Sequence, residues 1–318
     1  MKAVFLDFAT YYPEGLDVAA LEASVDDFVF HDFTAPEDII DRVKDAEIIL
    51  TNKCNITAEV IAACPDLKII IEGATGYNNI DVDAARDAGI PVCNVKGYST
   101  PSVTQHVFAF ILALNTRVTE YHKDVQQGKW ETARDFCFLD YPIYELAGKM
   151  LGIIGYGDLG RSVEGIAKAF GMEVLLADHK DVQETRTGRT PFADVIARSD
   201  VITLHCPLMD NTRDLIAAAE LAAMKDNAVL INTARGGIVN EGDLADALRR
   251  GVIGGAGVDV LSQEPPRDGN PLLDPDIPNL ILTPHTAWAS REACQRLFDQ
   301  LVEVIDGFKS GELMNRVA

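Results

Sequence analysis

The sequence predicts an α/β protein built from two doubly wound parallel sheets. Short β-branched apolar runs alternate with helical patterns from the first residues onward, which is typical of parallel strands covered by helices on both faces. The alternation stops near residue 100 and begins again at Met150. The length of 318 residues also suits two domains, at roughly 100 to 200 residues each.

The first series contains apolar runs that we expect to be strands, at residues 3–6, 48–50, 69–71 and 91–95. Helical patterns lie between them, at residues 38–44 and 82–88. Thr100 and Pro101 then have the residue types of a helix cap and a first turn, and the apolar pattern continues to Leu114. We expect this long helix to link the two domains.

The second series contains six strand-like runs, which is enough for a complete dinucleotide-binding sheet. They lie at residues 150–154, 173–177, 201–204, 228–232, 257–260 and 280–283. A last helix, at about residues 290–308, follows the completed sheet and could return to the first domain. We therefore expect a discontinuous domain of residues 1–100 and 289–318, and a second domain of residues 101–288.

The charge excludes several classes of partner. The formal net charge is −21 and the sequence pI is about 4.6, so nucleic acids and anionic membrane surfaces would repel the chain. The six cysteines have neither metal-ligand nor disulfide-framework spacing, and no apolar run approaches the ~20 residues that span a bilayer. We expect a cytoplasmic protein with no metal site and no membrane or nucleic-acid partner.

The strongest motif is Gly155-Tyr156-Gly157-Asp158-Leu159-Gly160, which follows a predicted strand and opens a helix. In this context the glycines allow a tight turn, close approach to a pyrophosphate, and close packing of helix on strand. The helix N-terminus offers free N–H groups to the phosphates. The motif therefore predicts a dinucleotide site with Gly155, Gly157, Asp158, Leu159 and Gly160 at the cofactor.

Asp178 follows the next strand and bears on the choice of cofactor. A carboxylate there can accept the ribose hydroxyls and would repel a 2′-phosphate, which favours NAD over NADP. His179, Lys180, Arg186 and Arg189 lie nearby in sequence. This basic cluster either forms a solvated loop or receives a phosphate, and the residues alone leave both readings open.

Open parallel sheets bind ligands beyond the carboxyl ends of their strands, so the residues that follow each strand are the candidates. Arg235, Glu264 and His285 follow three successive strands and can converge. The remaining candidates at strand ends, expected to contact the cofactor, are His205, Cys206, Pro207 and Thr212.

The residue types at Arg235, Glu264 and His285 suit the reduction of a 2-oxo acid. Arg235 can bind a carboxylate with two parallel donors. Hydride addition to a ketone leaves an alkoxide that needs a proton, and His285 is the side chain best suited to exchange one near neutrality. A carboxylate at Glu264 would orient the imidazole and favour its protonated form.

The sequence contains four separated motifs that resemble, in residues and in order, those of the D-isomer-specific 2-hydroxyacid dehydrogenases. They are the glycine motif, Asn232-Thr233-Ala234-Arg235-Gly236-Gly237, Asp259-Val260 with Glu264-Pro265, and Pro284-His285-Thr286-Ala287. The resemblance covers essentially the whole chain. It implies a flavodoxin-like substrate domain, a Rossmann NAD-binding domain, an active site in the cleft between them, and a homodimer formed through residues of about 101–145.

The resemblance also implies site residues. Arg235, Glu264 and His285 take the catalytic positions, and Thr104, Thr233, Ala234, Asp259, Arg235 and His285 lie where the family contacts the nicotinamide half. Ala74, Thr75 and Gly76 match the loop that holds the substrate carboxylate, together with Arg235 and His285. The family often carries an acidic residue near Gln105-His106, and this chain lacks it.

Within the family, the segment 135–149 and the run from His285 to Ser290 look like the glycerate dehydrogenase (hydroxypyruvate reductase) branch. Asn52 and Trp288 are then expected at the substrate, which would be a small 2-oxo acid such as hydroxypyruvate or glyoxylate. The sequence leaves open D-lactate or phosphoglycerate-like substrates, the preferred reaction direction, and an NAD-binding corepressor-like scaffold. Glu264 argues against formate dehydrogenases, which use glutamine there.

Overall fold

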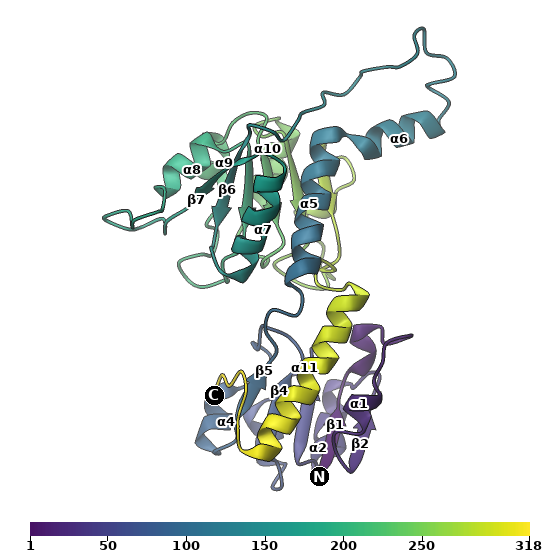
Figure 1. Cartoon of the computed structure of the whole chain (residues 1–318), viewed down its shortest axis with the longest axis vertical. Coiled ribbons are helices and arrows are strands. Elements are labelled where there is room, and N and C mark those ends of the chain that lie inside the picture. Colours follow the sequence, from purple (N-terminus) through teal and green to yellow (C-terminus); the bar gives the residue numbers. More distant parts are fainter. The chain divides into compact units, whose positions relative to one another are not determined.

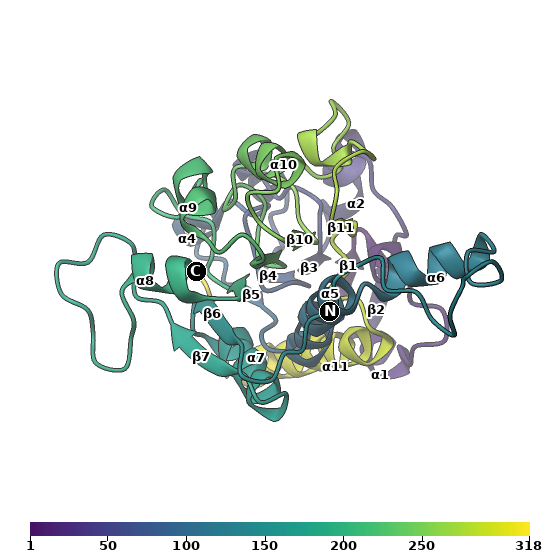
Figure 2. The ribbon, with the colours of Figure 1, turned by 90° about the horizontal axis from the view of Figure 1, so that it is seen from above.

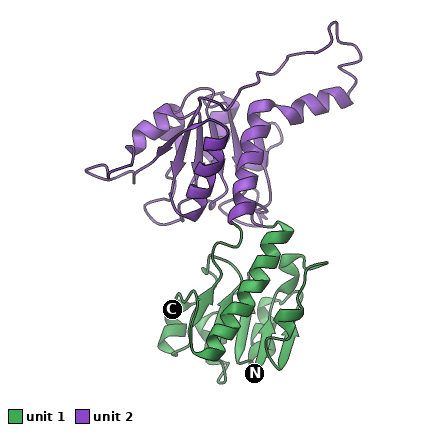
Figure 3. Ribbon diagram, in the orientation of Figure 1, with its two compact units in different colours: residues 1–99, 289–318 green, residues 100–288 purple.

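The computed structural model describes residues 1–318 and divides the chain into two compact units. Unit 1 comprises Met1–Ser99 and Ala289–Ala318, and unit 2 comprises Thr100–Trp288 (Figure 3). Each unit holds one fully parallel sheet flanked by helices, so the predicted α/β fold class is confirmed. None of the helices combines the length and the apolar character that crossing a membrane would require.

Unit 1 contains a five-stranded sheet in the order β2-β1-β3-β4-β5. The strands are β1 (Lys2–Phe5), β2 (Asp27–Phe30), β3 (Ile48–Thr51), β4 (Ile69–Glu72) and β5 (Val92–Asn94). β3, β4 and β5 are buried throughout, as continuous apolar runs predict. β2 was not predicted; it is an edge strand whose residues are half-buried or exposed, and its apolar run, residues 28–30, is short and lies between polar residues.

Helices cover both faces of this sheet (Figure 1). They are α1 (Ala19–Glu22), α2 (Ile39–Val43), α3 (Ala58–Ala62), α4 (Val82–Asp87), α11 (Arg291–Ser310), and the short 3-10 turns η1 (Phe8–Tyr11) and η2 (Pro36–Asp38). α2, α3 and α4 share one apolar core with the sheet. α11 contacts α1 and β4, and its buried face includes Phe298, whose ring lies 5.6 Å from that of Tyr11. Residues 289–318 thus complete unit 1.

Unit 2 contains a six-stranded sheet in the order β11-β10-β9-β8-β6-β7. The strands are β6 (Met150–Ile154), β7 (Glu173–Leu176), β8 (Val201–Leu204), β9 (Val229–Asn232), β10 (Gly255–Val258) and β11 (Leu280–Leu282). The chain starts at β6 and moves to one edge before returning through β8 to the other. The strand order therefore reverses between β6 and β8, which is where sheets of this kind bind ligands.

β10 lies two residues earlier than predicted, at 255–258 instead of 257–260. The strand begins with glycines that pack against α5 (Thr100–Thr116). A Cβ added to Gly257 would lie 2.6 Å from the ring of Phe110 on that helix. Close approach of a helix therefore requires glycine inside this strand.

The helices of unit 2 also form two layers (Figure 1). α5 and α7 (Asp158–Ala169) share one core with the sheet, and α8 (Phe192–Arg198), α9 (Ala218–Ala223) and α10 (Glu241–Arg249) share the other. The short turn η3 (Pro271–Leu273) contacts α10. α5, which we expected to link the domains, lies wholly within unit 2.

An arm extends from the rest of unit 2. It consists of α6 (Val118–Gln126) and the segment 127–145, and Figures 1 and 2 both show it projecting from the sheet and its helices. α6 buries no residue, and Phe136 and Leu139 are 88% and 74% exposed. The segment 127–145, which overlaps the region expected to form the dimer, thus presents apolar side chains to solvent in the single chain.

Candidate active site

The glycine motif forms the turn from β6 into α7. Gly155 has φ = 94°, which favours glycine, and a Cβ there would collide with the backbone of Cys206. A Cβ on Gly160 would lie 2.5 Å from the carbonyl oxygen of Gly155. Beside Gly157, which caps α7, an added Cβ would meet no atom within 4 Å, so the helix N-terminus is open to a ligand. Asp158 and Leu159 follow in the first turn of α7.

A pocket of about 370 Å³ lies at the carboxyl ends of β6, β7 and β8. Its lining contains the predicted cofactor residues Gly155, Asp178, Cys206 and Thr212. The Oγ1 of Thr212 donates to the carbonyl oxygen of Pro207 at 2.7 Å and so shapes the turn after β8. The pocket therefore occupies the position where the strand order reverses, as expected for a dinucleotide site.

Asp178 has a fully buried side chain with charged and neutral donors around it. Its Oδ1 accepts from the backbone N–H of His179 at 2.9 Å and from Nε of Arg186 at 2.7 Å. Its Oδ2 accepts from the backbone N–H of Arg186 at 2.7 Å. These bonds, led by that of the Arg186 side chain, hold the pKa of the Asp178 carboxyl well below its usual range.

Two buried polar atoms at the strand ends of unit 2 have no partner within the chain. They are the Nδ1 of His205 after β8 and the Oγ1 of Thr233 after β9. Burial lowers the pKa of His205 to about 4, so its ring is neutral at pH 7. Unsatisfied buried groups of this kind mark a place for a polar ligand.

The residues present fit a nicotinamide dinucleotide. They offer the open N-terminus of α7, the pocket, and the unpartnered atoms of His205 and Thr233. Thr104, by contrast, is satisfied, because its Oγ1 donates to Oγ of Ser162 at 2.9 Å.

Arg235, Glu264 and His285 follow β9, β10 and β11, three neighbouring strands of one edge of the sheet. The Nδ1 of His285 lies 2.6 Å from Oε2 of Glu264, and Oε1 of Glu264 accepts from the backbone N–H of Leu261 at 2.8 Å. Because the carboxylate only accepts when ionised, Nδ1 carries the proton and Nε2 is left to face a substrate. Both side chains are about one-third exposed, so a small molecule can reach them.

Asp259 organises the loop that carries His285. It is 1% exposed, and its carboxylate accepts from Oγ1 of Thr283 at 2.5 Å and from the backbone N–H groups of Thr286 and Ala287, each at 2.9 Å. The backbone N–H of His285 also donates to the carbonyl oxygen of Asp259 at 2.7 Å. His285 keeps φ = 54° within this network, so the loop is held tightly in an otherwise unfavourable conformation.

Near the position of the missing acidic residue, His106 supports the same network. Its Nε2 lies 3.1 Å from Oγ1 of Thr283, and its ring packs edge-on against Phe110 at 4.5 Å. The indole Nε1 of Trp288 donates to the carbonyl oxygen of His285 at 2.9 Å. Trp288 thus braces the histidine loop from the other side.

Arg235 presents an exposed guanidinium. Its Nη1 donates to the carbonyl oxygen of Ala234 at 2.7 Å, and its own carbonyl oxygen accepts from Nδ2 of Asn232 at 3.0 Å. The guanidinium forms no ion pair with a carboxylate of the chain, and most of its N–H donors are available. The guanidinium can therefore bind an anionic ligand.

Unit 1 places the predicted substrate residues at the carboxyl ends of β3 and β4, which are neighbours in its sheet. The Nδ2 of Asn52 donates to Oγ1 of Thr10 at 3.0 Å. In the loop Ala74–Gly76, Oγ1 of Thr75 donates to the carbonyl oxygen of Val95 at 3.1 Å. Their role toward a substrate stays a prediction.

Glu72 lies two residues before that loop and was not among the predicted site residues. Its Oε2 accepts from Nδ2 of Asn79 at 2.9 Å, and its fully buried Oε1 has no partner. Burial raises its pKa to about 9, with a further contribution from nearby Asp7. Glu72 is therefore protonated at neutral pH. The one sign of this residue in the sequence is that a carboxylate ends an apolar strand run.

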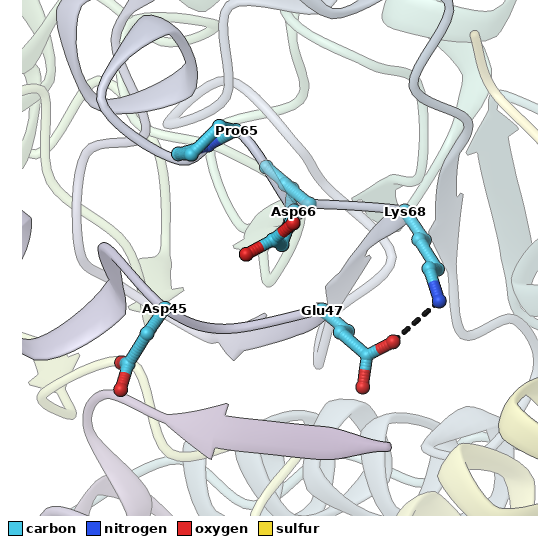
Figure 4. Close-up of a pocket in the computed structure, with 6 residues that line it drawn as sticks. Asp45, Glu47, Pro65, Asp66 and Lys68 are labelled. Atoms are coloured by element: carbon cyan, nitrogen blue, oxygen red, sulfur yellow. Dashed lines mark hydrogen bonds and ion pairs between the residues drawn. The ribbon is translucent and has the colours of Figure 1, made fainter.

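A second pocket, of about 480 Å³, is larger but lies at the opposite edge of the unit 1 sheet (Figure 4). Asp45, Glu47 and Asp66 line it near the amino ends of β3 and β4, with Pro65, Leu67 and Lys68. Figure 4 shows Lys68 directed at Glu47, with which it forms an ion pair. Ligands of such sheets bind at the carboxyl edge, so this hollow is not a candidate active site.

Comparison with known proteins adds three findings. Residues 108–287 match the family model described as D-isomer specific 2-hydroxyacid dehydrogenase, NAD binding domain. The chain is 45% identical to a glycerate dehydrogenase of Methylorubrum extorquens over 95% of its length and 97% of that protein. It is 40% identical to a hydroxypyruvate reductase of Blautia hydrogenotrophica, covering 100% of this chain and 99% of the other.

Among solved structures, an acyclic imino acid reductase in complex with NADPH and D-Arg superposes with a TM-score of 0.86 at 29% identity. The match covers 100% of both chains.

Proposed function

The chain belongs to the D-isomer-specific 2-hydroxyacid dehydrogenase family, and from this premise we propose that it reduces hydroxypyruvate or glyoxylate with NADH. The 2.6 Å contact of His285 with Glu264 is the observation that carries the proposal, and Arg235, which forms no ion pair, follows the neighbouring strand β9. The names of the two relatives, glycerate dehydrogenase and hydroxypyruvate reductase, support this choice of substrate.

In the proposed reaction His285 acts as the acid. When bound, NADH supplies a hydride to the carbonyl carbon of the 2-oxo acid. The imidazolium of His285 gives its Nε2 proton to the carbonyl oxygen, so that the product is a neutral alcohol and the ring is left uncharged. Glu264 keeps the Nδ1 proton in place and stabilises the imidazolium before transfer. The reverse reaction uses the same groups, with the neutral ring as the base.

Arg235 is the proposed anchor for the substrate carboxylate. Its planar guanidinium offers parallel donors to the two carboxylate oxygens. Its charge also stabilises the negative charge that develops on the adjacent carbonyl oxygen during hydride transfer. The backbone bonds around Ala234 and Asn232 orient the side chain for this contact.

NAD is the proposed cofactor, and Asp178 its proposed ribose ligand. The name of the matching family model, which describes an NAD-binding domain, supports the assignment. The six cysteines are all free, which suits a reducing compartment such as the cytoplasm.

We also propose that the arm of residues 118–145 forms a homodimer. Its exposed apolar side chains would be covered by a second copy of the chain. Sedimentation equilibrium should give the mass of a dimer, and Phe136→Asp with Leu139→Asp should shift it to the monomer. A wild-type monomer at micromolar concentration would refute this part.

A panel of substrates tests the proposed activity. Purified protein with NADH should turn over hydroxypyruvate and glyoxylate faster than pyruvate or a phosphorylated 2-oxo acid. Preference for pyruvate would indicate a D-lactate dehydrogenase, and preference for the phosphorylated acid a phosphoglycerate-like enzyme. Absence of NADH oxidation with every acid would instead favour a scaffold that binds the cofactor without chemistry.

A further inference from the structure

The ribose end of the cofactor pocket is cationic in a chain whose net charge is −21. Three cations line the pocket, against two carboxylates; the cations are Lys180, Arg186 and Arg189, and the carboxylates are Asp178 and Asp181. All five belong to the segment between β7 and α8, which Figures 1 and 2 show projecting from unit 2. Their charges sum to +1 at the pocket, and Glu184, the remaining charged residue of the segment, does not line it.

This segment is tied back to the sheet at its base. Ala177 and Thr190 form a parallel bridge, with the N–H of Asp178 donating to the carbonyl oxygen of Thr190 at 2.9 Å and the N–H of Thr190 to that of Leu176 at 2.8 Å. Arg186 and Arg189 are thereby held beside the end of β7.

The two arginines differ from Lys180 in how their charge is used. The Nζ of Lys180 lies 2.8 Å from Oε1 of Glu220, so its charge is compensated. The guanidinium of Arg189 lies 4.9 Å from the centre of the Tyr156 ring and forms no ion pair. Arg186 bonds Asp178 through Nε and Nη2, and with 54% of its side chain exposed it keeps donors that the carboxylate does not use.

The bonds from Arg186 to Asp178 change how the Asp178 carboxylate interacts with a ligand. A bare carboxylate would accept the ribose hydroxyls and repel a 2′-phosphate. Here the backbone N–H groups of His179 and Arg186 and the guanidinium of Arg186 already surround it. The repulsion of a phosphate is therefore largely cancelled, and two guanidinium groups remain close by to bind it.

We propose that Arg186 and Arg189 form a site for the 2′-phosphate of NADP(H), so that the pocket accepts NADPH as well as NADH. When the phosphate is bound, the guanidinium of Arg186 bridges it and Asp178. When NADH is bound, the ribose hydroxyls compete with Arg186 for the Asp178 oxygens. The inference rests on the proposed function in one respect, because both concern the same cofactor pocket.

Binding without turnover tests the site directly. Calorimetry with the full chain should show that adenosine 2′,5′-bisphosphate binds at least as tightly as adenosine 5′-monophosphate. Arg186→Ala and Arg189→Ala should each weaken binding of the bisphosphate by about tenfold or more, the usual size of a lost charge-assisted contact, and change binding of the monophosphate by less than about twofold. Arg186→Lys should retain part of the preference, since it keeps the charge.

Arg198→Ala is the matched control. Arg198 is an exposed arginine in the last turn of α8, outside the pocket, and its loss should leave both affinities unchanged. The preference for the bisphosphate should also shrink as the salt concentration is raised from about 0.05 to about 0.5 M. Salt shortens the distance over which charges attract each other, to a few ångströms at about 1 M. Bisphosphate binding at least tenfold weaker than monophosphate binding in the wild type would overturn the inference, as would equal losses for both ligands in the two variants.

Turnover separates this inference from the proposed function. With hydroxypyruvate, the ratio of the KM for NADPH to that for NADH should rise in the Arg186→Ala and Arg189→Ala proteins, and it should stay at the wild-type value in Arg198→Ala. NADH turnover without any NADPH turnover, together with no bisphosphate preference, would refute the inference alone. A normal bisphosphate preference without turnover of any 2-oxo acid would uphold the phosphate site and refute the proposed function.

Discussion

Replacing Glu72 by glutamine should remove a large part of the pH dependence of unit 1 stability between pH 5 and pH 9. Glu72 lies at the end of β4, fully buried, with Oε1 unpartnered and Oε2 bonded to Asn79. Burial raises the pKa of this carboxyl from 4.5 to about 9. Glutamine has nearly the same shape and stays neutral at every pH, so it mimics the protonated side chain.

The size of the effect follows from the two pKa values. Between pH 4.5 and about 9 the folded chain holds a proton on Glu72 that the unfolded chain has lost. The free energy of unfolding therefore falls by about 1.4 kcal/mol for each pH unit, or roughly 3 kcal/mol from pH 6 to pH 8. The contribution of the protonated group is complete below pH 4.5 and is lost as the pH rises through about 9.

Hydrogen exchange is the suitable assay because it reports local opening in a protein of two units. A peptide that covers β4 should lose protection from pH 6 to pH 8 in the wild type, after correction for intrinsic rates, and should lose much less in Glu72→Gln. Glu59→Gln, at an exposed position of α3, should follow the wild type. The same pH slope in the wild type and in Glu72→Gln would refute the assignment of a proton to Glu72.

Three further variants probe the site in unit 2. His285→Ala should lower kcat by at least ~100-fold with cofactor affinity measured by fluorescence titration intact, since it removes the proton donor; a near-normal kcat would exclude His285 as the acid. Arg235→Lys should raise the KM for the 2-oxo acid more than it lowers kcat, because a point charge lacks the two parallel donors; an unchanged KM would count against the anchor. Gly160→Ala should weaken dinucleotide binding and destabilise unit 2 by about 1–3 kcal/mol in denaturant unfolding, because its Cβ would lie 2.5 Å from the Gly155 carbonyl oxygen; wild-type stability and affinity would contradict this account.

The strands were predictable wherever both faces are buried. β3, β4 and β9 are continuous apolar runs because helices cover them on both sides. β2 was not predicted, because its apolar run of residues 28–30 is short and lies between polar residues. β10 was predicted two residues too late, and its glycines pack against Phe110, a residue about 150 positions earlier in the chain. Propensity describes local preference and carries no information on a distant helix.

The candidate site divides in the same way. Gly155, Arg235 and His285 could be predicted as candidates because their place after a strand is a local property of the sequence. The pairing of Asp178 with Arg186 and the burial of Glu72 depend on how a loop closes and on what covers a strand end. Such features determine charge and protonation, and they emerge only once the fold is known.

The central claim is that the chain transfers a hydride to the carbonyl carbon of a small 2-oxo acid and that the product has the D configuration. NADH deuterated at C4, prepared separately on each face, should be incubated with hydroxypyruvate and the glycerate analysed by NMR and chiral chromatography. The account predicts D-glycerate with one deuterium at C2 from one of the two labelled cofactors. Glycerate without deuterium from either cofactor, the L product, or no product would contradict it.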